Sequence, residues 1–479
     1  MSDVGTGTIS TKIPARLDRL PWSSWHWMIV IGLGTVWILD GLEVTIVGNL
    51  SAQLARPGSG LDITAAQVAG VAAALYVAGA CSGALFFGWL TDRFGRKKLF
   101  ILTLVVYLVA TLMTAFSFSA WWFFLFRFLT GFGIGGEYAA INSAIDELIP
   151  SRHRGRIDII INGSYWLGAA GGALLTVPLL NDLPVNIGWR VAFGLGVVLG
   201  LAILLVRRNV PESPRWLFIH GKDREAEEIV GDIERRVGGD LPEPEQSTTV
   251  HQRKSIGFLR IAHTMVALYP KRTVLGLSLF IGQAFLYNAI TFGYAQILAT
   301  FFKIDTHTGY YFAVIAVGNF LGPLLLGPLF DTVGRIPMIS ATYIGSGVLL
   351  LGTAWLFAQG SLTAVTLTAC WSVVLFVASA GASSAYLTVS EIFPMETRAM
   401  AIAFFFAIGT AAGGITGPLL FSSLVATGVP GDTALAFAIG ALVMIAAGLV
   451  ELFLGVKAER RGLEAIAPPL TTADAPRPA

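Results

Sequence analysis

Two short charged motifs each occur twice in this sequence, once in each half of a largely apolar chain. Gly88-Trp-Leu-Thr-Asp92-Arg93-Phe-Gly95-Arg96 lies between two long apolar runs, and its pattern returns at Gly327-Pro-Leu-Phe-Asp331-Thr-Val-Gly334-Arg335, 239 residues later. Glu147-Leu-Ile-Pro150 with Arg154 returns as Glu391-Ile-Phe-Pro394 with Arg398. A repeated charged loop in a membrane-spanning composition indicates two homologous halves, an architecture typical of transporters whose site lies between the halves.

The composition indicates that most of the 479 residues lie in lipid. Charged residues make up 13% of the chain, whereas a soluble domain carries about 25%. The net charge of +2 gives no reason to expect nucleic acid as a partner. Cys81 and Cys370 both fall in apolar runs, so we expect small core residues rather than a disulfide framework. We expect no cleavable signal peptide, because the first apolar run is long enough to span a membrane.

Apolar stretches long enough to cross a bilayer, about 20 residues each, predict the transmembrane helices. There are twelve, at 25–49, 65–90, 98–118, 121–145, 157–180, 189–206, 273–300, 309–330, 336–358, 363–389, 399–425 and 433–455. Six precede a long polar segment and six follow it. This division predicts an N-terminal tail at 1–24, a first helical unit at 25–206, a polar loop at 207–272, a second helical unit at 273–456 and a C-terminal tail at 457–479.

Lys and Arg are concentrated in the loops on one side of these helices. The loops on the other side hold only Arg56, Arg190 and Lys303. The positive-inside rule therefore places both termini and the long polar segment in the cytoplasm, which indicates a multi-pass protein of the plasma (inner) membrane. In that segment we expect a short amphipathic helical layer near 222–237 and a linker at 242–249. The Pro/Ala-rich tail after residue 464 is expected to be disordered.

The motifs, in this order and in these loops, resemble those of the major facilitator superfamily, and more closely its branch of sugar porters and metabolite/proton symporters. The pieces that carry the resemblance are Gly88–Lys98, Arg127–Glu137, Glu147–Arg156, Pro211–Arg215, Asp331–Arg335 and Glu391–Arg398. The resemblance implies an all-α membrane protein with twelve transmembrane helices in two six-helix bundles, around a central cavity that opens alternately to each side.

The resemblance also implies a charged network at the cytoplasmic helix ends. Ion pairs that can separate and re-form suit a bistable interface between two bundles. We predict such a gate network from Asp92, Arg96, Glu147, Arg154, Asp331, Arg335, Glu391 and Arg398. The alternative is that these charges only set the topology and cap helices, which is the interpretation we prefer for Lys97 and Lys98.

Ionisable residues at membrane depth are costly and usually functional. The first helix carries Asp40 and Glu43, the fourth carries Arg127 and Glu137, and helices seven to eleven carry none in their interiors. At 1.5 Å per residue, Glu43 and Arg127 both lie about 10 Å from the outer end of their helices. We predict that they pair and that Asp40, Glu43 and Arg127 couple transport to protons, with either Asp40 or Glu43 carrying the proton. A static pair that only orders the helices is the alternative, and Glu137 is expected at a helix end near the cytoplasm.

Neutral polar and aromatic residues at membrane depth predict the substrate site, because amides and rings suit a polar organic solute. The candidates are Asn162, Tyr165, Trp166, Gln283, Tyr287, Asn288, Asn319, Ser383 and Tyr386. Sugar porters typically have Gln-Gln in helix seven, whereas this chain has Gly282-Gln283. The substrate class therefore stays open between a sugar and an organic anion held by Arg127.

The predicted function is proton-coupled symport (uptake) of a small polar organic solute by alternating access. The alternatives are a proton-driven antiporter that exports drugs or metabolites, and a facilitative uniporter. Exporters usually carry a Gly-Pro kink in the fifth helix, and here Gly171-Gly172 is followed by Pro178 only later. No nucleophile–base pair or metal-ligand cluster stands out, so we expect no enzyme, no cofactor and no metal. The expected partners are the solute, protons and the lipid bilayer, and the expected state is a monomer.

Overall fold

The computed structural model describes residues 8–64, 67–207, 212–238, 241, 243–244, 247–251, 262–304, 307–394 and 397–468. Within these ranges the side chains of Asp92 and Arg96 are among a few that lie outside the described part. The first half forms helices α2 (Ser24–Leu54), α3 (Ala73–Phe94), α4 (Arg96–Ala115), α5 (Ala120–Leu148), α6 (Ser151–Gly163), α7 (Tyr165–Asn181) and α8 (Val185–Arg207). The second half forms α12 (Pro270–Phe302), α13 (Thr308–Thr332), α14 (Arg335–Ala358), α15 (Ala364–Ile392), α16 (Arg398–Ala426) and α17 (Pro430–Leu454).

These helices give the twelve predicted spans, with α6 and α7 together forming the fifth. Among the described residues, nine helices are long and apolar enough to cross a membrane. The other three spans fall short for visible reasons. Helix α5 carries Arg127 and Glu137, and the fifth span is interrupted at Ser164. Of α8, the described side chains include a shorter apolar stretch, Val185–Leu201. The second predicted span, 65–90, begins instead as a π-helix at Gln67–Ala72 and continues into α3.

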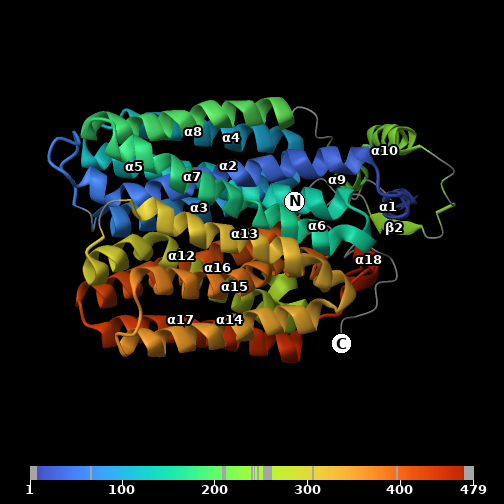
Figure 1. Ribbon diagram of the computed structural model, residues 1–479. Helices are drawn as coiled ribbons and strands as arrows, with labels where there is room; N and C mark the ends of the chain where they lie inside the picture. Colours follow the sequence, from blue (N-terminus) through green and yellow to red (C-terminus); the bar gives the residue numbers. More distant parts are fainter. Residues whose placement is uncertain are drawn as a thin grey trace.

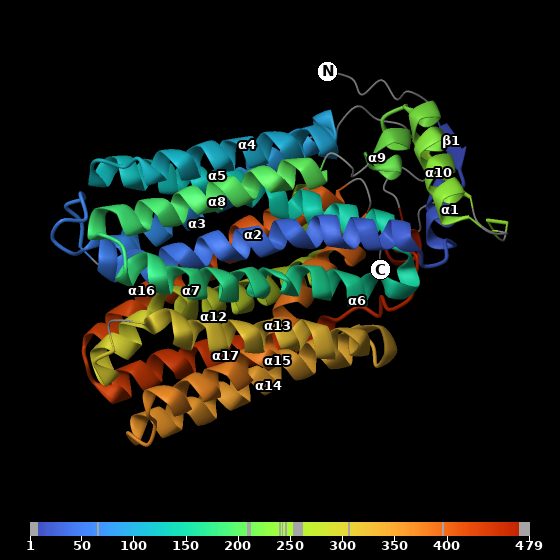
Figure 2. The same cartoon turned by 45° about the horizontal axis from the view of Figure 1, so that its top comes forward.

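The two halves are separate layers of helices that meet along one interface (Figure 1). In the first half α3 packs on α5, α2 on α7 and α4 on α8; in the second half α12 packs on α16, α14 on α17 and α13 on α15. The halves touch where α16 meets α3 and where α13 lies along α6 and α7. The same arrangement is visible after a rotation of 45° (Figure 2).

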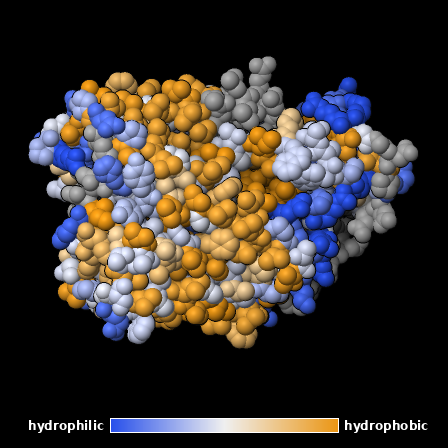
Figure 3. All heavy atoms as spheres, in the orientation of Figure 1, coloured by the Kyte–Doolittle hydropathy of each residue, from blue (hydrophilic) through white to orange (hydrophobic). Residues whose placement is uncertain are grey.

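Glycines allow the closest helix crossings. A Cβ on Gly79 or Gly83 of α3 would overlap the carbonyl oxygens of Phe128 and Phe132 on α5, and one on Gly135 would overlap that of Ala80 on α3. Small residues on both helices let the backbones approach, and such contact is the main source of helix association in lipid. The outer surface is apolar along the middle of the helices and hydrophilic toward the two ends (Figure 3).

One end of the bundle carries the duplicated motifs together with a small extramembrane layer, and we call this end the motif face. The layer contains α1 (Ile13–Asp18), α9 (Pro214–Ile219), α10 (Asp223–Val237) and α18 (Leu463–Ile466). Helix α10 confirms the amphipathic stretch predicted near 222–237, since Ala226, Val230 and Ile233 are buried on one side of it. The short antiparallel pair β1 (Thr8–Thr11) and β2 (Thr248–His251) was not predicted, and β2 overlaps the predicted linker. Residues 469–479 of the predicted disordered tail lie outside the described residues.

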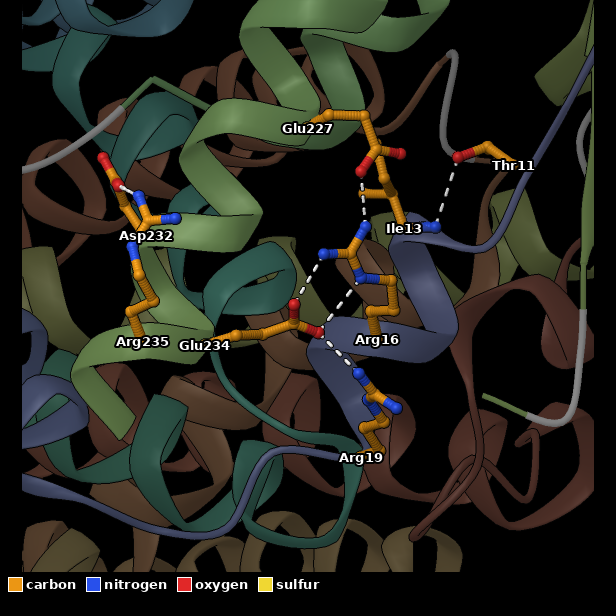
Figure 4. A network of polar contacts seen from close by, with 8 residues as sticks. All are labelled: Thr11, Ile13, Arg16, Arg19, Glu227, Asp232, Glu234 and Arg235. Carbon is orange, nitrogen blue, oxygen red and sulfur yellow. Dashed lines mark hydrogen bonds and ion pairs between the residues drawn. The ribbon is translucent and has the colours of Figure 1, made fainter. Parts of the chain in front are cut away.

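Helix α1 is fastened to α10 by a cluster of ion pairs (Figure 4). Glu234 accepts hydrogen bonds from Arg16 at 2.5 and 3.0 Å and from Arg19 at 2.6 Å. Arg16 also pairs with Glu227. The hydrogen bonds from Arg16, and then those from Arg19, lower the pKa of Glu234. Charge-assisted pairs with two partners are among the stronger polar contacts at a protein surface.

This cluster predicts a pH-dependent attachment of α1. Because the pKa of Glu234 is lower in the folded state than its usual value, its contribution is present at neutral pH and is lost as the pH falls through that lowered pKa. We expect Glu234→Gln at neutral pH to reduce the hydrogen-exchange protection of α1 by about fivefold, since the pairs are partly exposed. Glu228→Gln is the matched control, because within the described ranges Glu228 pairs only with Arg224 on the same helix. Equal protection in the two variants would contradict this account.

Candidate functional site

A cavity of about 150 Å³ lies between the two halves. Eight of the nine predicted substrate residues line it: Asn162, Tyr165, Trp166, Gln283, Tyr287, Asn288, Ser383 and Tyr386. The ninth, Asn319, lies behind the wall. Its amide oxygen accepts a hydrogen bond from the Tyr287 hydroxyl at 3.1 Å, and its main-chain oxygen accepts one from Ser379 at 2.6 Å. Asn319 therefore positions a lining residue and does not itself line the cavity.

Aromatic side chains that the sequence analysis did not select complete the wall. Trp37 of α2 stacks on Tyr138 of α5, with ring centroids 4.7 Å apart and planes 6° from parallel. Both approach Tyr386 of the other half, at 6.1 and 6.4 Å, and Tyr138 packs on Phe406 at 4.8 Å. One signal was available for Trp37, because it precedes Asp40 by three residues and so shares its helix face. The other polar and aromatic lining residues that were missed are Tyr76, Thr291, Phe292, Ser379 and Thr410.

Several buried polar atoms of lining residues have no hydrogen-bond partner among the described residues. They are the indole nitrogen of Trp37, the hydroxyl of Tyr76 and the amide oxygen of Asn162. The Asn162 amide nitrogen, by contrast, donates hydrogen bonds to the side-chain oxygen of Asn142 and to the main-chain oxygen of Asp158, both at 2.9 Å. A buried polar atom without a partner is costly. The residues that line the cavity thus carry both donors and acceptors without a partner, while the described lining contains no Lys, Arg, Asp or Glu.

The link between Tyr287 and Asn319 gives a testable expectation. Tyr287→Phe keeps the ring in the wall but leaves the buried amide oxygen of Asn319 unpaired, so we expect the apparent affinity for the transported solute to fall by about threefold to tenfold. The measurement is the concentration dependence of uptake. Tyr294→Phe is the control, because Tyr294 lies on the same helix and bonds Thr368 at 2.6 Å, away from the cavity. A weaker affinity in both variants would point to general damage to α12.

Glu43 and Arg127 form an ion pair, at 3.3 Å between Oε1 and Nη1, as expected from their depths. Both side chains are about 1% exposed. The same carboxylate oxygen accepts a hydrogen bond from Thr111 of α4 at 3.0 Å. The guanidinium lies over the rings of Tyr76, at 4.9 Å, and Phe193, at 5.8 Å. Because Tyr76 also lines the cavity, the ion pair is one residue away from the space between the halves.

Further buried acids surround this pair. Asp40 is fully buried and lies in electrostatic range of the Tyr76, Tyr138 and Tyr165 hydroxyls. Two buried carboxyls inside helices were missed in the sequence: Asp158 on α6 and Glu451 on α17. Asp158 lies one helical turn before Asn162 and interacts electrostatically with Tyr386. Asp158 escaped notice because the predicted fifth helix began only one residue before it. Glu137, also buried, interacts with Tyr107 of α4.

Three second-half members of the predicted gate network, Asp331, Arg335 and Glu391, form one connected cluster. Arg335 contacts Asp331 at 3.0 Å and binds both oxygens of Glu391, at 3.0 and 3.1 Å. The fourth member, Arg398, is also buried and donates to the main-chain oxygen of Ser390, the residue before Glu391, at 2.6 Å. A bidentate arginine between two carboxylates fixes the ends of α13, α14 and α15.

The first-half members are arranged differently, because the extramembrane layer supplies their partners. Arg154 pairs with Asp18 of α1 at 3.1 Å. Arg215, from the Pro-Glu-Ser-Pro-Arg motif, approaches the same carboxylate at 3.8 Å. Glu147 accepts a hydrogen bond from the Ser213 hydroxyl. Asp92 and Arg96 lie outside the described side chains.

The halves touch at the motif face through a main-chain group. The amide N–H of Arg156 on α6 donates to the Asp331 carboxylate of α13 at 2.8 Å. Gly155 allows this approach, since a Cβ there would overlap the Arg335 guanidinium. Arg154 also donates to the main-chain oxygen of Arg461 in the C-terminal segment, at 3.5 Å. The ion pairs described above each stay within one half, and these main-chain contacts join the halves.

Comparisons with known proteins agree with this architecture. Residues 23–468 match the family described as "Sugar (and other) transporter". The chain is 25% identical to the niacin transporter NiaP of Acinetobacter baylyi over 94% of its own length and 99% of that protein. It is 27% identical to myo-inositol transporter 2 of Schizosaccharomyces pombe, over 81% of this chain and 72% of that one. Among solved structures, the proton:xylose symporter XylE is similar, with a TM-score of 0.73 at 19% identity, over 92% of this chain and 99% of that chain.

Two layers of membrane-spanning helices around a shared cavity, together with the family match, define a multi-pass membrane transporter. The chain belongs to the sugar (and other) transporter family of the major facilitator superfamily.

Proposed function

We propose that this protein is a proton-coupled symporter that takes up a small polar organic solute by alternating access. The observation that carries the proposal is the buried Glu43–Arg127 pair, which is separated from the cavity by the Tyr76 ring. An arginine stays charged at all accessible pH values, so the carboxyl must be the group that gains and loses a proton.

In this mechanism the ionised Glu43 pairs with Arg127 and keeps the guanidinium behind Tyr76, outside the cavity. Protonation removes half of the ion pair and leaves Arg127 with only its ring contacts and a neutral carboxyl. Tyr76 touches both the guanidinium and the cavity, so the change reaches the solute site through one side chain. Asp40, on the same helix face as Glu43, is the second candidate carrier, because it interacts with lining tyrosines.

The cavity favours a single-ring solute that is uncharged where it meets the wall. Trp37, Trp166 and Tyr287 offer ring faces, and the amide oxygen of Asn162 and the indole N–H of Trp37 offer hydrogen bonds. Relatives are named for niacin, myo-inositol and xylose, each of which is a single polar ring. Arg127 is paired with Glu43 and covered by two rings, so direct capture of an organic anion by this arginine requires that pair to open first.

The motif face is proposed to be cytoplasmic in the inner membrane, because the loop arginines gather there. Residues 25–206 and 273–456 then act as the two moving units, with 1–24, 207–272 and 457–479 on the cytoplasmic side and the protein working as a monomer. When the cavity faces outward, the Arg156 N–H bond to Asp331 and the Arg154 bond to the main-chain oxygen of Arg461 hold this face closed. The ion pairs within each half position these groups.

The test is uptake of labelled sugars, polyols and pyridine carboxylates into proteoliposomes, with and without an imposed proton gradient. Accumulation above the external concentration only with an inward gradient supports symport. Equilibration that ignores the gradient identifies a uniporter, and gradient-driven efflux identifies an antiporter.

A further inference from the structure

A second cleft, of about 350 Å³, opens at the motif face between the two halves. It is lined from the first half by Arg152, His153 and Arg156 of α6. The second half contributes Pro328, Asp331 and Thr332 of α13, and the segment after α17 contributes Arg460. This cleft is separate from the central cavity, with which it shares no lining residue.

The cleft carries an excess of positive charge. Within the described part of the chain, Arg152, Arg156 and Arg460 form no ion pair, whereas five other arginines near this face do: Arg16, Arg19, Arg154, Arg215 and Arg335. The single acid in the lining, Asp331, is already engaged by Arg335 and by the Arg156 amide. Three guanidinium groups therefore converge on one space without a carboxylate of their own.

Contacts within the protein restrain the side chains of Arg152 and Arg156. Arg152 donates to the main-chain oxygen of Leu20 at 2.9 Å, and Arg156 lies 3.5 Å from the His153 ring nitrogen. The His153 ring packs edge-on against Trp22 at 5.3 Å. Arg460 adopts a left-handed backbone conformation, with φ of 56°, which is uncommon for a residue with a side chain. Such pre-organisation lowers the entropy cost of binding an anion.

We propose that this cleft binds a phosphate group, bridged by Arg152 and Arg156 of one half and Arg460 of the other. Guanidinium groups match phosphate oxygens in charge and planar geometry, and His153 adds a ring nitrogen at the same site. Since the ligand touches both halves, its binding adds a clamp across the motif face and favours the state in which that face is closed. The phosphate can belong to a lipid headgroup or to a soluble compound.

The first experiment measures the thermal unfolding of the purified full-length protein in sodium phosphate and in sodium chloride of equal ionic strength. A ligand that binds only the folded state raises the unfolding midpoint in proportion to its affinity. We expect phosphate, but not chloride, to raise it, and Arg460→Gln and Arg156→Gln each to weaken the apparent phosphate affinity by about tenfold. Lys457→Gln is the matched control, because it removes the same charge from the same exposed segment without lining the cleft.

The second experiment identifies the source of the phosphate. Hydrogen exchange of α6 is measured in phosphatidylcholine vesicles, in the same vesicles with phosphatidic acid, and with inorganic phosphate added. Protection by phosphatidic acid indicates a lipid headgroup, and protection by inorganic phosphate alone indicates a soluble ligand. The proposal is overturned if chloride acts like phosphate, or if Arg460→Gln responds to phosphate as Lys457→Gln does. Neither readout depends on transport, so failure here leaves the proposed symport untouched.

Discussion

Glu43→Gln is expected to abolish gradient-driven accumulation while leaving solute exchange across the membrane intact. The glutamine keeps the shape of the side chain and can still accept from Thr111 and Arg127, which lie 3.0 and 3.3 Å from the carboxylate. It cannot take up or release a proton. Proteoliposomes with an inward proton gradient should therefore fill only to the external solute concentration, whereas counterflow of labelled solute should continue at a rate within about tenfold of the native protein.

Two comparison variants make this result specific. Glu451→Gln neutralises another buried carboxyl, on α17 in the other half, and should retain accumulation. Asp40→Asn tests the neighbouring acid: if it loses accumulation while Glu43→Gln keeps it, Asp40 is the proton carrier. Native accumulation in both the Asp40 and Glu43 variants would rule out this acidic pair as the coupling device.

The second large effect is expected from Gly168→Ala on α7. A Cβ at this position would overlap the main-chain carbonyl of Ile38 on α2, and a backbone cannot move aside as a flexible side chain can. Ile38 is two residues from Asp40, so the overlap also displaces the helix that carries the proposed proton site. Overpacking costs about 1–3 kcal/mol in well-packed cores, and we expect a lower unfolding midpoint and little correctly folded protein.

Gly171→Ala on the same helix is the control, because nothing lies within 4 Å of the Cβ that it would add. Alanine is a better helix former than glycine by about 1 kcal/mol, so this variant should be as stable as the native protein or slightly more stable. A similar loss in both variants would mean that α7 tolerates no change, and the α2–α7 crossing would not be the cause.

Much of the fold could be predicted from the sequence, because a bilayer restricts a chain to helices of a known length. Twelve apolar stretches and two repeated motifs were enough for the architecture. The boundaries were less certain where polar residues enter a helix. Asp158 was missed for this reason, since the sequence 151–156 carries three arginines and resembles a loop, whereas α6 already begins at Ser151.

The site could be predicted where one-dimensional geometry is sufficient. Helical rise alone set Glu43 and Arg127 at the same depth, and the structure pairs them at 3.3 Å. Contacts that depend on tertiary packing could not be foreseen. Asn319 had the residue type of a solute ligand but lies behind Tyr287, and Asp18 comes from a tail helix with no pattern to link it to Arg154.

The hydrogen bond between the halves at the motif face has a main-chain donor, the N–H of Arg156. Replacing the Arg156 side chain therefore does not remove it. Because the Arg156 main-chain nitrogen makes the bond to Asp331, every residue except proline would supply the same N–H at position 156. Substitutions at position 156 could therefore change the charge of the neighbouring cleft during evolution without removing the hydrogen bond between the halves. The acceptor is the side chain of Asp331, so a substitution at position 331 would remove both this hydrogen bond and the ion pair with Arg335.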